Sequence, residues 1–339
     1  MSLNHTALFP ADRATAVNAA LEKAFGSAVV SESVLLTGGL SAAAVYKIMV
    51  DDRPYVMKLA IPGNHTTEVS FERIALAAKA GIAPSLHYIN PEEGIIISGF
   101  VDSKPVRHIF GGTTLAEKLA EAVKKIHAIP YTVPGDDMKV TIDQIVEGFR
   151  QNKMLTGPIP DECLALYEKA KRAYPWQDAD KVFSHNDLNP SNILCDGANI
   201  WIIDFDTAFL NDRYIDLAGV ANFFIYSPEQ EAVFLETYFG VVTPYQTARF
   251  YVMRQISRII YSLMMLQLAG QNKAAGHEVD QQMESVFLKD IGPLIGSGKL
   301  SLATYEGQLL YGKALMHEAV LQMRSERFDE ALLLLENNK

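Results

Sequence analysis

A polar segment enclosed by apolar runs limits how this chain can fold more than any other feature of the sequence. Residues 183–209 read FSHNDLNPSNILCDGANIWIIDFDTAF, and their histidine, asparagines and aspartates are costly to bury unless something pairs with them. The runs NILCD and NIWIID on either side of the turn DGAN predict two short strands. Such a hairpin would bring the polar residues before its first strand next to those after its second strand.

Length and composition indicate a folded protein of two lobes. The 339 residues are many for a single hydrophobic core, and hydrophobic residues make up 49% and charged residues 21% of them. The net charge of -10 disfavours nucleic acid as a ligand and mildly favours cationic partners. Cys163 and Cys195 are too few for a disulfide framework or a zinc site, so we expect a cytoplasmic protein.

The apolar runs of the chain predict no membrane insertion. No run reaches about 18 uninterrupted apolar residues, and the longest candidate, around QISRIIYSLMMLQLAG, is accompanied by Arg254 and Arg258. We expect this segment to be a core helix. The N-terminal MSLNHTALFP has neither a basic start nor an apolar stretch, so we also expect no targeting segment. The sequence leaves the oligomeric state undetermined.

The first hundred residues change their hydrophobic period several times. The order that they predict is helix, strand, glycine turn, strand, strand, helix, strand, strand. The turn DDRP would join the second and third runs as a hairpin, and the second helix would run from about Thr66 to Ala80. We therefore expect residues 1–101 to form a β-rich lobe with a small antiparallel sheet.

From about residue 104 onward the helical period dominates, apart from the polar hairpin. We expect helices at 113–129, 141–151, 161–172, 228–238, 244–269, 278–290 and from 303 nearly to the end. Residues 102–339 would then form a mostly helical second lobe. The fold class is α+β with two lobes, and the cleft between such lobes is the expected ligand site.

Three residues of the polar segment supply the parts that phosphoryl transfer needs. A residue must orient the attacking hydroxyl and accept its proton, and Mg2+ prefers carboxylate, amide and water oxygens. Asp187, Asn192 and Asp204 follow one another at five and twelve positions. The first spacing lets one loop present both side chains, and the second leaves room for a strand, a turn and a strand.

HNDLNPSN followed by IIDFD resembles the catalytic loop and metal-binding segment of the aminoglycoside phosphotransferase and choline kinase family. That family has a bilobed protein-kinase-like fold and the pattern H-x-D-x-x-x-x-N, then a hydrophobic run and Asp. The resemblance implies ATP and Mg2+ as cofactors, with Asp187 as catalytic base and Asn192 and Asp204 as metal ligands. Asp206 would assist a second metal or the substrate. His185 is better interpreted as a structural histidine that bonds the loop backbone.

The N-terminal lobe extends this resemblance, because the family places a glycine turn over the phosphates and a lysine on the next strand. YVMKLA puts Lys58 within an apolar strand, where a buried ammonium needs an anionic partner. Glu68 and Glu72 lie four residues apart, on one helical face, and we favour Glu72 as the partner. The phosphate turn within TGGLSAAAVYKI would use Gly38, Gly39 and Ser41.

The segment IIISGFVDSKPV lies where the family has its hinge, and Ser98 and Phe100 would contribute main-chain groups to adenine. The resemblance covers roughly residues 30 to 225. It implies a nucleotide-binding role for residues 1–101 and a catalytic and substrate-binding role for residues 102–339.

The departures from protein kinases favour a small hydroxyl compound as the acceptor. Asn186 replaces the usual arginine, Asp206 stands at the glycine of Asp-Phe-Gly, and no Ala-Pro-Glu follows. Choline or ethanolamine suits the nearby aromatic residues, whereas an aminoglycoside suits acidic side chains, and both are cationic. A sugar or another alcohol stays open. The alternative from another class is a non-catalytic, kinase-like nucleotide-binding module.

Overall fold

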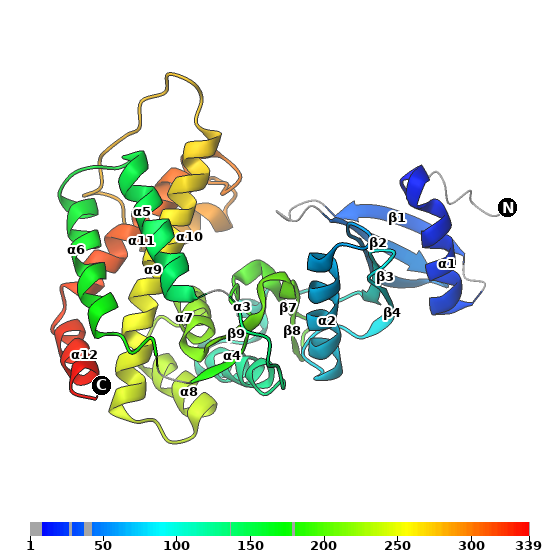
Figure 1. Cartoon of the computed structure of the whole chain (residues 1–339), viewed down its shortest axis with the longest axis horizontal. Helices are drawn as coiled ribbons and strands as arrows, with labels where there is room; N and C mark the ends of the chain where they lie inside the picture. Colours follow the sequence, from blue (N-terminus) through cyan, green and yellow to red (C-terminus); the bar gives the residue numbers. More distant parts are fainter. Residues whose placement is uncertain (1–8, 27–28, 37–42, 136, 178–179, 339) are drawn as a thin grey trace. The chain divides into compact units, whose positions relative to one another are not determined.

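The computed structural model describes residues 9–26, 29–36, 43–135, 137–177 and 180–338. The chain divides into two compact units (Figure 1). The first contains Met1–Tyr131 and Phe183–Phe209, and the second contains Thr132–Val182 and Leu210–Lys339. The polar segment at 183–209 therefore belongs to the same unit as the N-terminal sheet. The division of roles between 1–101 and 102–339 stays a prediction.

A five-stranded antiparallel sheet forms the centre of the first unit, as the sequence predicts. Its strands lie in the order β1-β2-β3-β5-β4 and have the bounds β1 Val30–Leu36, β2 Ala44–Val50, β3 Arg53–Leu59, β4 Leu86–Asn90 and β5 Ile95–Gly99. The predicted hairpin between β2 and β3 turns at Asp51 and Asp52, with φ of 48° and 60°. Two successive left-handed residues are the geometry of a tight turn that matches the twist of the strands.

The alternation of side chains along the strands gives the sheet two different faces. Met57 and Leu59 of β3 pack into the hydrophobic core together with helix α1 (Ala14–Phe25). Lys58 lies between them in sequence, so its side chain leaves the sheet on the opposite face. Helix α2 (His65–Lys79) lies on that side in Figure 1. The strand period thus separates the ammonium of Lys58 from the apolar core.

The first unit also contains two helices and a hairpin next to the polar segment. They are α3 Val106–Ile109, α4 Gly112–His127, β7 Ile193–Cys195 and β8 Ile200–Ile202. β7 and β8 form the predicted hairpin, in which Ile193 is opposite Ile202. Strands β6 (Lys181–Ser184) and β9 (Phe209–Asp212) carry the chain across the boundary between the units.

The described part of the second unit is mostly helical. Its helices are α5 Met138–Asn152, α6 Pro158–Ala173, α7 Arg213–Phe224, α8 Pro228–Phe239, α9 Pro244–Asn272, α10 Leu288–Gly296, α11 Tyr305–Met323 and α12 Glu326–Glu336. The 29-residue helix α9 lies against α5, α6, α7, α11 and α12 and contributes most of its residues to the core. The α+β fold class predicted from the sequence is therefore confirmed.

The predicted helix at 278–290 is wrong, because α10 begins only at Leu288. Side chains of this stretch bond to groups elsewhere in the unit instead. Gln281 accepts a hydrogen bond from the backbone N–H of Thr156 at 2.9 Å, and Asp280 accepts one from Lys313 at 3.0 Å. Asp280 also accepts the backbone N–H of Gln282 at 3.0 Å, and such local side-chain bonds to the backbone compete with helix formation. The long helix expected after residue 303 is broken between α11 and α12, at residues 324–325.

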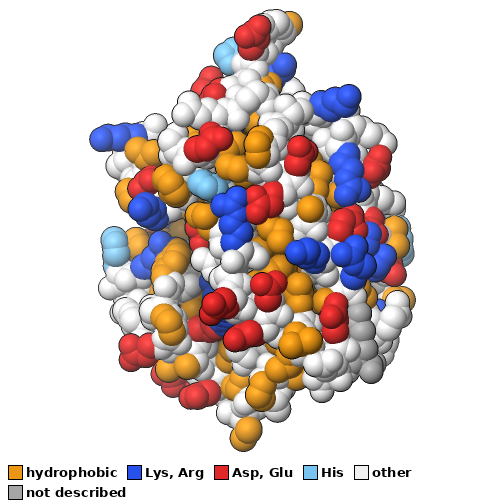
Figure 2. All heavy atoms as spheres, turned by 90° about the vertical axis from the view of Figure 1, so that its left-hand side faces the viewer, with side chains coloured by type: hydrophobic (Ala, Val, Ile, Leu, Met, Phe, Trp, Pro, Cys, Tyr) orange, Lys and Arg blue, Asp and Glu red, His pale blue; other side chains and the backbone are white. Residues whose placement is uncertain are grey.

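The surface of the second unit carries charges of both signs. Figure 2 shows acidic and basic side chains interspersed on one face, with hydrophobic side chains between them. On this face the net charge of -10 is not gathered into one acidic patch. Among the described helices, none combines the length and the apolar character needed to cross a membrane.

Candidate active site

The loop from residue 185 to residue 192 joins β6 to β7, and His185 fastens its beginning. The imidazole is fully buried, and its Nε2 lies 3.0 Å from the carbonyl oxygen of Ile203. Its Nδ1 accepts the backbone N–H of Asp187 at 3.3 Å, which assigns the proton to Nε2. The expected structural role of His185 is therefore what the contacts show.

Asn186 and Thr207 fasten the same loop to the segment after β8. Asn186 Nδ2 donates to the carbonyl of Thr207 at 2.8 Å and to that of Ser184 at 3.1 Å. In return, Thr207 Oγ1 donates to the carbonyl of His185 at 3.0 Å. Asn186 has a φ of 66°, a conformation that asparagine tolerates better than most residues. The two polar stretches on either side of the hairpin are thus bonded to each other directly.

Amide groups hold the carboxylate of Asp187 in place. Asn189 Nδ2 donates to Oδ1 at 3.0 Å, and Asn192 Nδ2 donates to Oδ2 at 3.2 Å and to the Asp187 carbonyl at 2.9 Å. The amide nitrogen of Asn192 is therefore turned toward Asp187. Its oxygen Oδ1 accepts no hydrogen bond within the described residues, which leaves it suited to bind a cation.

The register of the hairpin places Asp204 near Asn192. The backbone N–H of Ile203 donates to the Asn192 carbonyl at 3.1 Å, and Asp204 is the next residue. Asp204 has a φ of 66° and a ψ of 62°, a left-handed conformation that costs energy for a residue other than glycine. Desolvation by the surrounding protein and then the negative charge of Asp206 raise the pKa of the Asp204 carboxyl. A bound cation would relieve this unfavourable charge.

Lys58 pairs with Asp206 and not with the helix glutamates. Its Nζ lies 2.9 Å from Oδ2 and 3.0 Å from Oδ1 of Asp206. The expected ion pair with Glu72 is wrong for this structure. Glu72 and Glu68 lie on the exposed side of α2, and Oε2 of Glu68 is 3.7 Å from Nδ1 of His65.

The face of α2 that turns toward Asp206 carries Ser70 and Arg73. Ser70 Oγ donates to Oδ1 of Asp206, and Arg73 Nη1 donates to its carbonyl at 2.7 Å. Burial raises the pKa of Asp206, but the charge of Lys58 and the hydrogen bonds from Ser70 and Lys58 outweigh it, so the net pKa is lowered. The sequence interpretation missed Ser70 and Arg73. Their spacing of three residues, which shares one helical face, was the available signal.

The other residues predicted for the nucleotide are placed as follows. Gly38, Gly39 and Ser41 lie outside the described residues. Ser98 is in β5 opposite Val56, and the ring of Phe100 lies 4.4 Å from the Nζ of Lys47. In the part of the chain that the structure describes, the main chain of Phe100 takes part in no hydrogen bond outside a strand.

The oxygen donors of this site fit Mg2+, provided that other ligands complete its shell. No group of three or more His, Cys, Asp and Glu side chains in the described residues could hold a metal ion alone. The carboxylate of Asp204 and the amide oxygen of Asn192 are two hard donors. Magnesium is usually bound by one or two protein carboxylates, with substrate phosphates and water as further ligands.

The family model described as "Phosphotransferase enzyme family" matches residues 34–251, more than half of the chain. This chain belongs to that family. The resemblance found in HNDLNPSN and IIDFD is therefore confirmed, and the matched range includes Lys58, Asp187 and Asp204.

Solved structures with a similar fold agree with the family. A choline/ethanolamine kinase family protein from Mesorhizobium loti is 18% identical, with a TM-score of 0.62, over 96% of this chain and 99% of that one. A spectinomycin phosphotransferase in complex with ADP and spectinomycin is 14% identical, with a TM-score of 0.56, over 90% of this chain and 98% of that one. At these identities the likeness shows the kinase-like fold.

Among curated proteins, an uncharacterised protein of Metamycoplasma hominis is 26% identical over 107 residues. The match spans 31% of this chain and 21% of that protein. It therefore adds no information about the acceptor.

Proposed function

We propose that this phosphotransferase is a small-molecule kinase that transfers the γ-phosphoryl group of ATP to an alcohol, with Mg2+. The observation that carries the proposal is the set of bonds that gathers Asp187, Asn192 and Asp204 around one hairpin, with Lys58 paired to Asp206 in the same unit. These residue types are the ones that phosphoryl transfer uses for the hydroxyl, the metal and the phosphates.

In this proposal Asp187 orients the acceptor hydroxyl and takes its proton. The amides of Asn189 and Asn192 hold the carboxylate in one orientation, which lowers the entropic cost of aligning the hydroxyl. Asn192 and Asp204 hold Mg2+, which neutralises charge on the phosphates when bound.

Lys58 would bind the α- and β-phosphates and so exchange its partner Asp206 for the nucleotide. Gly38, Gly39 and Ser41 would cover the phosphates, and the main chain from Ser98 to Phe100 would bind adenine. Phosphate oxygens are strong acceptors for an ammonium group, so the exchange keeps the lysine paired.

The acceptor in this proposal is a cationic alcohol of the choline or ethanolamine type, encountered in the cytoplasm. The net charge of -10 favours cationic ligands, and the aromatic residues after the metal segment offer faces for a quaternary ammonium. Phe223 and Tyr261 lie edge to face at 5.5 Å, and Tyr226 is 69% exposed. An aminoglycoside is the second candidate, supported by the fold shared with the spectinomycin phosphotransferase.

ADP release in the presence of ATP and Mg2+ tests the proposal directly. The acceptors to compare are choline, ethanolamine, spectinomycin, kanamycin and glucose, each with a no-acceptor control. We expect kcat/KM to be higher for choline or ethanolamine than for the other acceptors. Activity with an aminoglycoside alone would select the second candidate.

A non-catalytic nucleotide-binding module is distinguished by thermal shift. Both the kinase and the module would gain Tm with ATP, and the kinase would gain more when Mg2+ is added. A gain in Tm without phosphoryl transfer to any acceptor would favour the module.

A further inference from the structure

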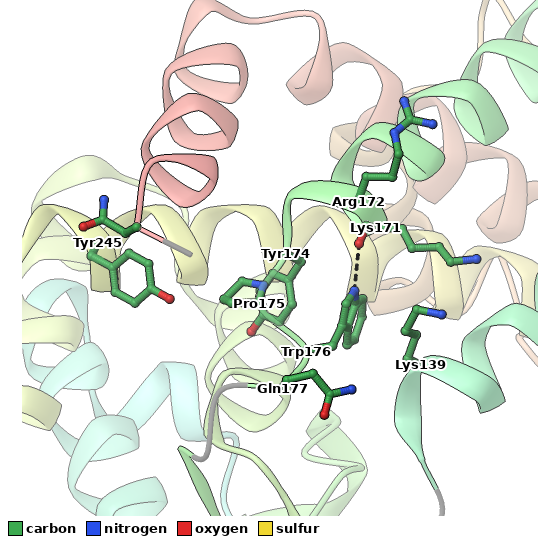
Figure 3. A pocket seen from close by; sticks show the side chains of 9 residues that line it. Lys139, Lys171, Arg172, Tyr174, Pro175, Trp176, Gln177 and Tyr245 are labelled. Carbon is green, nitrogen blue, oxygen red and sulfur yellow. Dashed lines mark hydrogen bonds between the residues drawn. The ribbon is translucent and has the colours of Figure 1, made fainter.

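The second unit contains a hollow that none of the residues proposed for phosphoryl transfer lines. It has a volume of about 620 Å³, within the usual range of small-molecule sites. It lies where the end of α6, the first turn of α5 and the first turn of α9 meet (Figure 3). The side chains that matter for the argument are Lys139, Lys171, Arg172, Tyr174, Trp176 and Tyr245.

The lining of this hollow is cationic, although the chain as a whole carries a net charge of -10. Lys139, Lys171 and Arg172 line it, and no Asp or Glu is among its described lining residues. Asp143 pairs with both lysines, at 3.2 Å from Lys139 Nζ, and Glu168 lies 3.9 Å from Lys171 Nζ. An ammonium group has three N–H donors, so these pairs leave each lysine donors for a further anion.

Internal hydrogen bonds fix the aromatic side of the hollow. Trp176 Nε1 donates to the carbonyl of Lys171 at 2.9 Å, the dashed line in Figure 3. Tyr174 donates its hydroxyl to Asp212 at 2.7 Å, and its ring centroid lies 4.8 Å from that of Trp176. The rings therefore need little ordering when a ligand binds, which favours affinity.

The support of Tyr174 continues into the core of the unit. Arg249 is 1% exposed, donates to Asp212 at 2.9 Å, and lies 5.5 Å from the ring centroid of Tyr174 and 6.0 Å from that of Tyr245. Arg249 and Asp212 together hold Tyr174, and Arg249 also lies beside Tyr245. Tyr174 and Trp176 are therefore anchored to the core of the unit.

We infer that this hollow binds a small aromatic anion, a planar ring that carries a phosphate or carboxylate group. The ring would lie against Trp176 or Tyr245, which are partly exposed, and its anionic group would accept hydrogen bonds from Lys139, Lys171 or Arg172. An apolar ligand would use the aromatic rings but not the cationic side chains. A cation would be repelled by Lys139, Lys171 and Arg172. The inference does not depend on the proposed kinase activity.

Phenyl phosphate is a minimal probe, because it combines one ring with one dianion. The chain has two tryptophans, Trp176 and Trp201, so in a Trp201→Phe background the fluorescence reports on Trp176 alone. We expect a saturable change with a Kd below about 10 mM. Benzyl alcohol, without the charge, and phenyltrimethylammonium, with the opposite charge, should bind at least about 10-fold more weakly.

Matched variants locate the charge recognition. Lys139→Gln and Arg172→Gln should each weaken the binding of phenyl phosphate by at least about 3-fold. Lys169→Gln, an exposed lysine of α6 outside the hollow, should leave it unchanged. Circular dichroism and Tm confirm that each variant is folded.

Three outcomes would overturn the inference. They are no saturable change up to about 10 mM phenyl phosphate, equal binding of benzyl alcohol, and unchanged binding in both hollow variants. The kinase proposal would stand in all three cases, because ADP release tests it separately.

Discussion

Lys58 and Asp206 form an ion pair that joins the central sheet to the segment after the polar hairpin, with 2.9 Å between Nζ and Oδ2. The pair lies beside α2, which supplies Ser70 and Arg73 to the same aspartate. A lysine that the sequence predicts to need an anion thus finds it 148 residues away. This contact makes Asp206 a structural partner as well as a neighbour of Asp204.

The Lys58–Asp206 pair predicts a dependence of stability on acid. Because the pKa of folded Asp206 is lowered, its stabilisation is present above the unfolded pKa near 4 and is lost as the pH falls through the folded value. Asp206→Asn should cost about 1 kcal/mol at pH 7 and less at pH 3, measured by urea unfolding. In a Lys58→Met background the substitution should cost less. An equal cost in both backgrounds would show that the pair is not responsible.

Asp187→Asn should abolish turnover and spare nucleotide binding. The carboxamide cannot accept the hydroxyl proton, so we expect kcat to fall by about 100-fold or more while the ATP affinity changes less than about 3-fold. Calorimetry and ADP release measure the two effects. Asp196→Asn is the control, since Asp196 accepts N–H groups of the hairpin turn and should alter stability alone. Activity retained by Asp187→Asn would remove Asp187 from its proposed role.

Asp204→Asn should weaken Mg2+-dependent ATP binding and activity, and it should raise the free energy of unfolding. Its raised pKa means that ionisation costs folding energy, and this cost grows as the pH rises from the unfolded pKa toward the folded one. Without metal, the variant should gain up to about 0.5 kcal/mol at pH 7, because solvent screens the effect. Asparagine also tolerates the left-handed backbone. A loss of stability together with unchanged Mg2+-dependent ATP binding would contradict both parts.

Gly94→Ala should destabilise the turn between β4 and β5 more than Gly63→Ala does. Both glycines have a φ near 60°, but a Cβ on Gly94 would lie 2.5 Å from the carbonyl oxygen of Ala60, whereas one on Gly63 meets nothing within 4 Å. We expect about 1 kcal/mol for Gly63→Ala, from the backbone alone, and at least about 2 kcal/mol for Gly94→Ala. Thermal unfolding of the two variants checks this, and equal costs would mean that the carbonyl can move away.

Two buried arginines of α9 should respond differently to replacement by methionine. Arg254 donates to Glu231 at 2.8 Å, to Asn222 and to two carbonyls, so its loss should cost about 3 kcal/mol. Arg258 donates to Gln255 at 2.6 Å, and its Nε has no partner within the described residues. Burial and the charge of Arg254 lower the pKa of Arg258 to about 10. Arg258→Met should therefore be neutral or stabilising, as urea unfolding would show, and a cost like that of Arg254→Met would refute this.

The sequence predicted most of the local structure of the site because its signals are short in range. The strands around DGAN follow from apolar runs and a turn, and the observed pairing of Ile193 with Ile202 is what such a hairpin produces. The structural role of His185 also followed from its position in the loop. The helix expected at 278–290 begins only at Leu288, and in the stretch before it Asp280 and Gln281 bond to distant groups, which no local pattern reveals.

By itself the sequence determined the fold class, the membership of the phosphotransferase family and the spacing of Asp187, Asn192 and Asp204, because periodicity and loop motifs are properties of neighbouring residues. Only the tertiary structure decided that Lys58 pairs with Asp206 instead of Glu72. The choice depends on which side of α2 faces the polar segment, and packing between distant elements sets that rotation.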